Sequence, residues 1–151
     1  PALIVRQEGN NAHTHPFVSV YEAYKKSGPN VLGVEALQGD DGCTGVKVNT
    51  ADGYADYLFT ATDMQAHHPS KRVSFCGGLG LIREKEGQIQ LMYLGCGRSL
   101  KKGNFVLESD HDVYAAIYMQ HGVWYYSATG PVRVKIGKET KELNEGYNQK
   151  L

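Results

Sequence analysis

The stretch VYAAIYMQHGVWYYSATGPVRVKI, residues 113–136, decides the fold class of this chain. It holds two runs rich in β-branched and aromatic residues, 113–119 and 123–127, and such residues favour strands. The tripeptide QHG separates the two runs, and this spacing is typical of a β-hairpin. A Gly-Pro turn then leads into a third run, VRVKI. The stretch therefore predicts consecutive antiparallel strands joined by short turns.

The same pattern of short apolar runs and turns extends over the rest of the chain, and no segment keeps a helical period over three turns. Gly95-Cys96-Gly97 interrupts the pattern and predicts a bulge or tight corner. We therefore predict an all-β domain, an antiparallel β-sandwich of about ten to twelve short strands, over residues 1–136. The polar segment 137–151 is expected to be a loosely ordered tail. The further expected strands cover residues 2–6, 16–24, 31–37, 43–49, 54–60, 72–75, 79–83, 88–94 and 105–107.

Composition limits the classes of function. The chain has 151 residues, enough for one domain with a core, and 16 basic residues balance 16 acidic ones. Without a basic excess we expect no nucleic-acid partner. We also expect no membrane span, since no apolar run is long enough. The chain shows no signal peptide and begins at Pro1 rather than Met, so we expect it to be processed or to be a piece of a longer protein.

Cofactor and catalytic motifs do not emerge from the sequence. The three cysteines have no CxxC spacing, and we expect them to be small buried hydrophobic residues rather than a disulfide framework. The glycines of residues 77–80 follow a strand, but no helix pattern comes after them, so a phosphate-binding loop is rejected. We therefore expect no cofactor and assign no catalytic residue.

Two histidines form a candidate metal site. His13 and His15 lie two residues apart, so on an extended chain both rings point the same way and could reach one ion. Further ligands would have to come from elsewhere, for example His67 and His68 in the longest loop. The simpler interpretation is a pair of solvated histidines before a strand.

Basic residues form two candidate sites for an acidic glycan. Arg98, Lys101 and Lys102 cluster after the Gly95-Cys96-Gly97 corner, and Lys71 and Arg72 follow the long loop. Such residues bind carboxylates and sulfates through charge-assisted hydrogen bonds. The competing interpretation is a set of solvated turns.

The ten tyrosines allow another interpretation. Tyrosine suits strands, and it also suits stacking against sugar rings. A free-standing carbohydrate-binding module would carry two or three exposed tyrosines on a flat or grooved face. Strand propensity alone is the simpler explanation of the tyrosine content.

Several segments resemble heparinase II/III-type polysaccharide lyases. PALIVRQEG followed by HPFVSVYEAY is similar to the late region of that family, as are ADGYADYLFTA, SFCGGLGLIREKEGQIQLMYLGCGRSLKKGNFVLES and VYAAIYMQHGVWYYSATGPVRVKI. The resemblance covers roughly Leu3 to Ile136. Complete members have an N-terminal helical toroid followed by β-sheet domains, and they cleave uronic-acid polysaccharides by β-elimination. Their catalytic tyrosine and histidine lie upstream of the region matched, so the resemblance carries over no catalytic residue.

The resemblance implies a non-catalytic C-terminal β-sandwich domain that supports upstream catalytic domains of the same parent chain. It also implies a periplasmic or extracellular location and allows contact with an acidic polysaccharide. A free-standing carbohydrate-binding module and a metal-binding β domain remain as alternatives.

Overall fold

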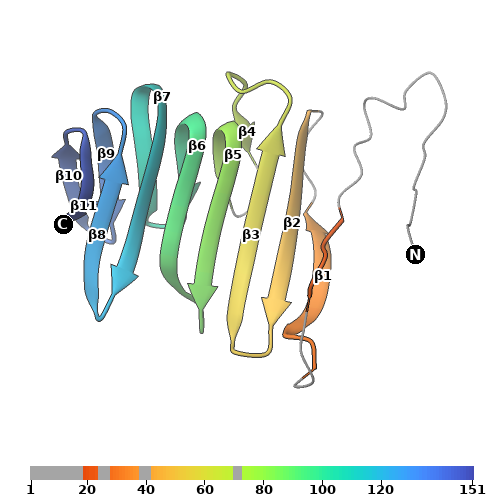
Figure 1. Cartoon of the computed structure of the whole chain (residues 1–151). Helices are drawn as coiled ribbons and strands as arrows, with labels where there is room; N and C mark the ends of the chain where they lie inside the picture. The colour runs from red at the N-terminus through yellow and green to blue at the C-terminus, as the bar shows by residue number, and fades with distance from the viewer. Residues whose placement is uncertain (1–18, 24–27, 38–41, 70–72) are drawn as a thin grey trace, which may run out of the picture.

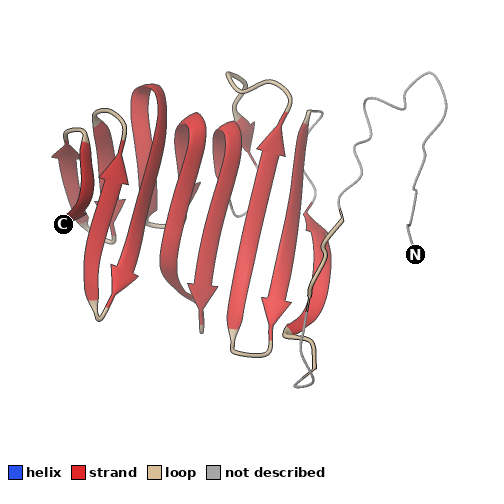
Figure 2. Ribbon diagram, in the orientation of Figure 1, coloured by secondary structure: helices blue, strands red, loops and turns tan. Residues whose placement is uncertain are grey.

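A computed structural model describes residues 19–23, 28–37, 42–69 and 73–151. The described residues form strands joined by turns, with no helix (Figure 2). The all-β prediction is therefore confirmed. The eleven strands are β1 (Val31–Leu37), β2 (Cys43–Thr50), β3 (Tyr54–Ala61), β4 (His68–Pro69), β5 (Ser74–Lys85), β6 (Gln88–Lys102), β7 (Phe105–Gln120), β8 (Val123–Ala128), β9 (Val132–Ile136), β10 (Glu139–Leu143) and β11 (Gly146–Lys150).

All strands belong to one antiparallel sheet with the order β1-β2-β3-β5-β6-β7-β8-β11. β4 pairs with β5, and β9 connects β7 to β10. Most neighbours in the sheet are also neighbours in sequence, because short turns return each strand beside the previous one. No helix in the described part of the chain is long and apolar enough to cross a membrane.

The sheet bends over on itself and thereby makes two layers (Figure 1). The C-terminal half of β7, Ala115 to Gln120, pairs with β8, whereas its N-terminal half, Phe105 to Glu108, pairs with β9. The front layer holds β1, β2, β3, β8, β11 and the adjoining halves of β5, β6 and β7. The back layer holds β4, β9, β10 and the other halves of the three long strands.

The core lies between the two layers. The ring of Phe59 on β3 lies 6.1 Å from that of Phe75 in the back half of β5. Phe105 on β7 and Trp124 on β8 make a similar contact at 5.8 Å. These contacts confirm the β-sandwich. The largest fully buried side chains are those of Phe75, Ile82, Met92, Leu94, Leu100, Leu107 and Ile117.

The bend depends on two glycines that touch across β5 and β6. A Cβ at Gly97 would lie 2.7 Å from the Cα of Gly77 and 2.6 Å from the carbonyl oxygen of Cys76. Cys96 has a positive φ of 49°, and the register of β6 on both neighbours shifts here. The predicted corner at Gly95-Cys96-Gly97 is therefore confirmed.

Three expectations about elements are wrong. Residues 139–150 form β10 and β11 rather than a loose tail, because main-chain pairing with β9 and β8 orders a polar segment. Residues 19–23, the described part of the expected strand 16–24, are not a strand. There the Glu22 carboxylate accepts hydrogen bonds from the backbone amides of Asn30 and Val31. The long strands β5, β6 and β7, of 12, 15 and 16 residues, each run through both layers where shorter strands were expected.

Candidate functional site

A polar cleft of about 460 Å³ lies where β6 and β7 turn from one layer to the other. We call it the bend cleft. Two arginines and three carboxylates line it, together with a histidine and two serines. The lining residues are Arg98, Ser99, Glu108, Ser109, Asp110, His111, Pro131, Val132, Arg133 and Glu142.

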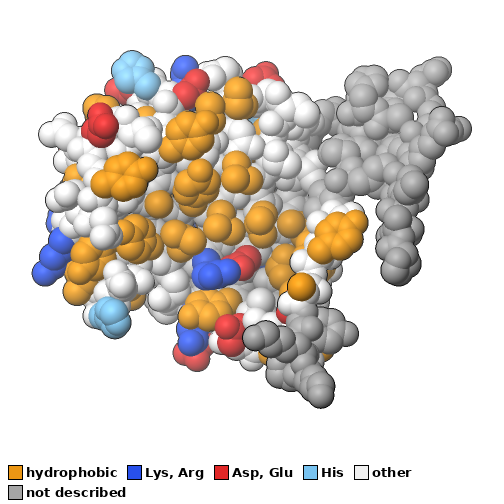
Figure 3. All heavy atoms as spheres, in the orientation of Figure 1, with side chains coloured by type: hydrophobic (Ala, Val, Ile, Leu, Met, Phe, Trp, Pro, Cys, Tyr) orange, Lys and Arg blue, Asp and Glu red, His pale blue; other side chains and the backbone are white. Residues whose placement is uncertain are grey.

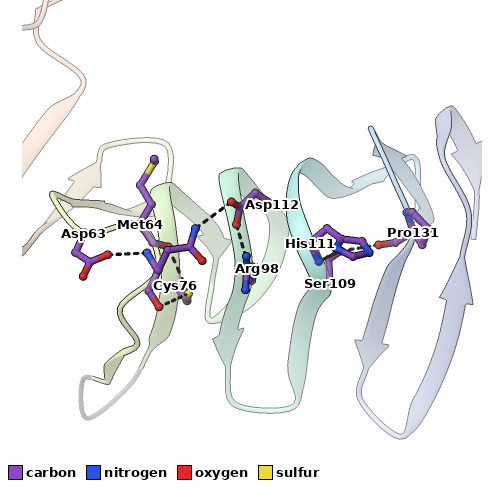
Figure 4. Close-up of polar contacts among 9 residues, drawn as sticks. Asp63, Met64, Cys76, Arg98, Ser109, His111, Asp112 and Pro131 are labelled. Atoms are coloured by element: carbon purple, nitrogen blue, oxygen red, sulfur yellow. Dashed lines mark hydrogen bonds and ion pairs between the residues drawn. The ribbon is translucent and has the colours of Figure 1, made fainter.

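Arg98 is held at one end of the cleft by a carboxylate of the next strand. Its Nε donates to Asp112 Oδ1 at 3.0 Å, and the side-chain amide of Gln65 donates to Asp112 Oδ2 at 3.0 Å (Figure 4). The Arg98 guanidinium and then the Gln65 amide lower the pKa of the Asp112 carboxyl. Asp112 is therefore ionised at neutral pH and neutralises Arg98.

Arg133 is held at the other end by two carboxylates. Its Nε donates to Glu142 at 2.6 Å and its Nη1 to Glu108 at 2.9 Å, and both contacts raise the pKa of Arg133. Glu108 also pairs with Lys101 Nζ at 2.7 Å. Lys101 and then Arg133 lower the pKa of Glu108 against the opposing effect of burial. Both arginines of the cleft are therefore paired with carboxylates.

Ser109 and His111 also line the bend cleft. The Ser109 hydroxyl donates to the carbonyl of Pro131 at 2.8 Å and accepts from the backbone amide of His111 at 3.2 Å (Figure 4). The His111 side chain is exposed. The arrangement can donate and accept hydrogen bonds with hydroxyl groups, but its two arginines are outnumbered by three carboxylates, so it gives little attraction for an anion.

The predicted basic cluster is divided because Lys101 and Lys102 alternate on β6, while a register shift between Gly97 and Ser99 turns Arg98 away from the side of Lys102. Arg98 lines the bend cleft, and Lys101 pairs with Glu108 on the outside of the back layer. Lys102 points between the layers, where its Nζ lies 2.8 Å from Glu84 and 3.3 Å from the centre of the Tyr57 ring. Lys71 and Arg72 lie outside the described residues.

The predicted metal ligands His13 and His15 also lie outside the described residues. His67 Nε2 lies 2.8 Å from the Ser74 hydroxyl, and the buried His68 contacts the carbonyl of Asp63. Within the part of the chain that is described, no three His, Cys, Asp or Glu side chains are grouped so that they could hold a metal ion.

Of the three cysteines expected to be buried, only Cys76 is; Cys43 and Cys96 are half-buried. Burial raises the pKa of the Cys76 thiol. Its Sγ donates to the carbonyls of Met64 and Gln65 at 3.5 Å, which ties the loop after β3 to β5.

The second notable surface is the outer side of the front layer, which we call the front outer face. Figure 3 shows hydrophobic side chains spread over this face in a nearly continuous patch. Tyr118 and Tyr125 stack on it, with ring centres 6.0 Å apart. The sequence contained the signal in the runs LGLI, LMYL and YAAIY, which are apolar at every position instead of at every second one. The hydrophobic residues of the face are Val46, Val48, Leu58, Leu79, Leu81, Leu91, Tyr93, Tyr114, Ala116, Tyr118 and Tyr125, and Asp56 and Arg83 lie among them.

Comparison with known proteins shows which family the chain is similar to. The family model described as the endo-acting ulvan lyase C-terminal domain matches residues 31–119, from the first residue of β1 almost to the end of β7. An endo-acting ulvan lyase of Formosa agariphila is 32% identical to the chain over 114 residues. That match covers 72% of this chain but only 14% of the enzyme. No solved structure matches the chain.

Proposed function

The chain belongs to the family of endo-acting ulvan lyase C-terminal domains, and from that premise we propose that it is the non-catalytic C-terminal domain of an ulvan-cleaving lyase. Its role is to support the catalytic domains of the same parent chain, by which we mean the longer protein that contains it. The parent would cleave an acidic polysaccharide by β-elimination, as the resemblance to heparinase II/III-type lyases implies.

The family match is the observation that carries this proposal. It covers β1 to β7 and hence strands of both layers together with the bend. The chain spans about a seventh of the length of the relative, so most of that enzyme lies outside the matched region. A domain of this size and position fits an accessory role beside a larger catalytic part.

The chemistry of the bend cleft supports a non-catalytic role. β-Elimination needs a cation to neutralise the uronate carboxylate, a base for the adjacent proton and an acid for the leaving oxygen. In the cleft, Arg98 and Arg133 already face carboxylates at 3.0 Å or less. Asp112 and Glu108 have lowered pKa values, which makes them poor proton donors at neutral pH.

The proposal includes a location. A polysaccharide is too large to enter a cell unaided, so its lyase would act in the periplasm or outside the cell. The upstream catalytic domains are then the main partner, and the acidic polysaccharide is the substrate of the whole protein.

Deletion of the domain from the parent chain tests the supporting role. We expect the shortened parent to melt at a lower temperature and to give less soluble protein, because the surface that the domain covers becomes exposed. If the shortened parent has the melting temperature and the ulvan-cleaving activity of the complete protein, the proposal is contradicted.

Contact with glycan is a second candidate role. The stacked Tyr118–Tyr125 pair and the half-exposed Tyr114 on the front outer face favour it, because aromatic rings stack against sugars. Under this alternative Lys71, Arg72, Arg98 and Lys101 would add contacts to acidic groups.

A further inference from the structure

We propose that the front outer face is the surface by which this domain docks on the preceding domains of its parent chain. The inference rests on the proposed function and adds to it the partner and the place of contact. Four features of the described residues support it.

The first feature is that the central strands of the front layer are apolar on both sides. On β5, Gly80 and Ile82 point into the core, while Leu79 and Leu81 point outward. Across from Leu81 lies Tyr93, and β6 and β7 repeat the pattern. A sheet with one solvated side shows polar residues on that side, whereas strands covered on both sides are apolar throughout. The front layer is therefore built like a sheet that is covered on both sides.

The second feature is the contrast with the outer side of the back layer. There the outward positions are mostly charged and form ion pairs, such as Lys101 with Glu108 and Arg133 with Glu142. The outer side of the back layer is thus polar, whereas the front outer face is apolar. Leu79 is 43% exposed and Tyr114 is 54% exposed on the apolar one. An apolar face of this kind marks an interaction surface.

The third feature identifies the side from which the preceding chain arrives. Residues 19–23, which precede β1, lie against the front outer face at its β1–β2 end, where Val20 and Tyr21 line an apolar hollow of about 390 Å³ together with Val46 and Leu79. Glu22 fixes this segment through the backbone amides of Asn30 and Val31. The polypeptide that leads into the domain therefore already covers one end of this face.

The fourth feature is charge, which favours a protein surface over an acidic polysaccharide. Arg83 lies on the front outer face, and its Nε and Nη2 donate to the two oxygens of Asp56 at 2.7 Å. A bidentate pair of this kind neutralises the cation. Binding of a polyanion needs unneutralised positive charge, whereas apolar docking needs none.

The test uses the parent chain with Leu79→Glu, and Thr140→Glu as the matched control on the outer side of the back layer. Both positions are exposed in this domain, so both changes should leave the melting temperature of the 151-residue chain within about 2 °C. In the parent, we expect Leu79→Glu to lower melting by at least about 4 °C and to speed proteolytic release of the domain, because it places a charge in the contact. Thr140→Glu should change neither. Tyr114→Ser provides a second variant and should act in the same direction as Leu79→Glu.

If the Leu79→Glu and Tyr114→Ser variants of the parent both keep the melting temperature and protease resistance of the unaltered protein, the docking surface is overturned. If deletion of the whole domain still destabilises that parent, the supporting role survives and only the surface is wrong. Salt-sensitive retention of the 151-residue chain on immobilised ulvan, lost in Leu79→Glu, would likewise overturn the proposal and assign the face to glycan.

Discussion

Glu84 and Lys102 form an ion pair of 2.8 Å that joins the two layers of the sandwich, with each side chain only 13% exposed. Glu84 lies near the end of β5 in the front layer, and Lys102 ends β6 in the back layer. The Lys102 ammonium also lies 3.3 Å from the centre of the Tyr57 ring, in a cation–π contact. Lys102 therefore holds the layers together and does not face solvent.

Replacement of Lys102 by Met tests that role. It leaves the Glu84 carboxylate without its ion-pair partner in a nearly buried place, and we expect a loss of about 3 kcal/mol in the free energy of unfolding. Urea unfolding followed by circular dichroism measures it. The double variant Lys102→Met with Glu84→Gln should recover at least half of the loss, because it also removes the unpaired charge. A single variant as stable as the unaltered chain would show that the pair does not join the layers.

Replacement of Gly97 by Ala tests the bend. The new methyl group would lie within 2.7 Å of the backbone of both Cys76 and Gly77, so β6 must move away from β5 at the bend. We expect a loss of about 2 to 3 kcal/mol, typical of overpacking against atoms that cannot rotate away. Gly33→Ala is the control, since nothing lies within 4 Å of its added methyl group. Equal unfolding curves for the two variants would contradict the close approach.

Much of the fold follows from local sequence signals. The run VLGVEAL and the final run VRVKI coincide with β1 and β9, because turn residues bound them and their composition favours strands. The corner at Gly95-Cys96-Gly97 was recognisable because two glycines flank a single residue there. The division of the sheet into two layers was not recognisable, since it depends on which half of β7 pairs with which partner.

The candidate surfaces were harder to predict. Arg98 was identified, but its partner Asp112 lies 14 residues away and meets it only through the pairing of β6 with β7. Sequence distance groups Lys102 with Arg98 and Lys101, but Lys102 alternates with Lys101 and points between the layers, and the register shift beside Gly97 turns Arg98 outward. The β10 and β11 strands were missed because their stability comes from pairing and not from apolar side chains.

Acidification tests the ion pairs of the back layer. The folded pKa of Glu108 is lowered by Lys101 and Arg133, so its stabilising effect is fully present above its unfolded pKa of about 4.3. The effect is lost as the pH falls through the folded value. We expect Glu108→Gln to cost up to about 1 kcal/mol at pH 7 and to reduce the loss of stability between about pH 5 and pH 3. Urea unfolding curves at these pH values measure the difference. Equal losses of stability between about pH 5 and pH 3 in the two proteins would contradict it.

Affinity electrophoresis tests the second candidate role. Because the arginines of the bend cleft and of the front outer face are paired with carboxylates, we expect the chain to migrate equally in gels with and without ulvan, heparin, chondroitin sulfate or alginate. The ratio of the mobility of the Arg98→Ala variant to that of the unaltered chain should be the same in every gel. Retardation by one acidic glycan that salt weakens would instead favour a binding module.

The most direct test of the central claim is the formation of unsaturated sugar ends from ulvan, followed by ultraviolet absorbance. The account predicts that the parent chain produces these ends and that the purified 151-residue chain alone produces none above the rate without protein. Unsaturated ends formed by the isolated chain would contradict the account, because the domain would then carry a complete active site of its own.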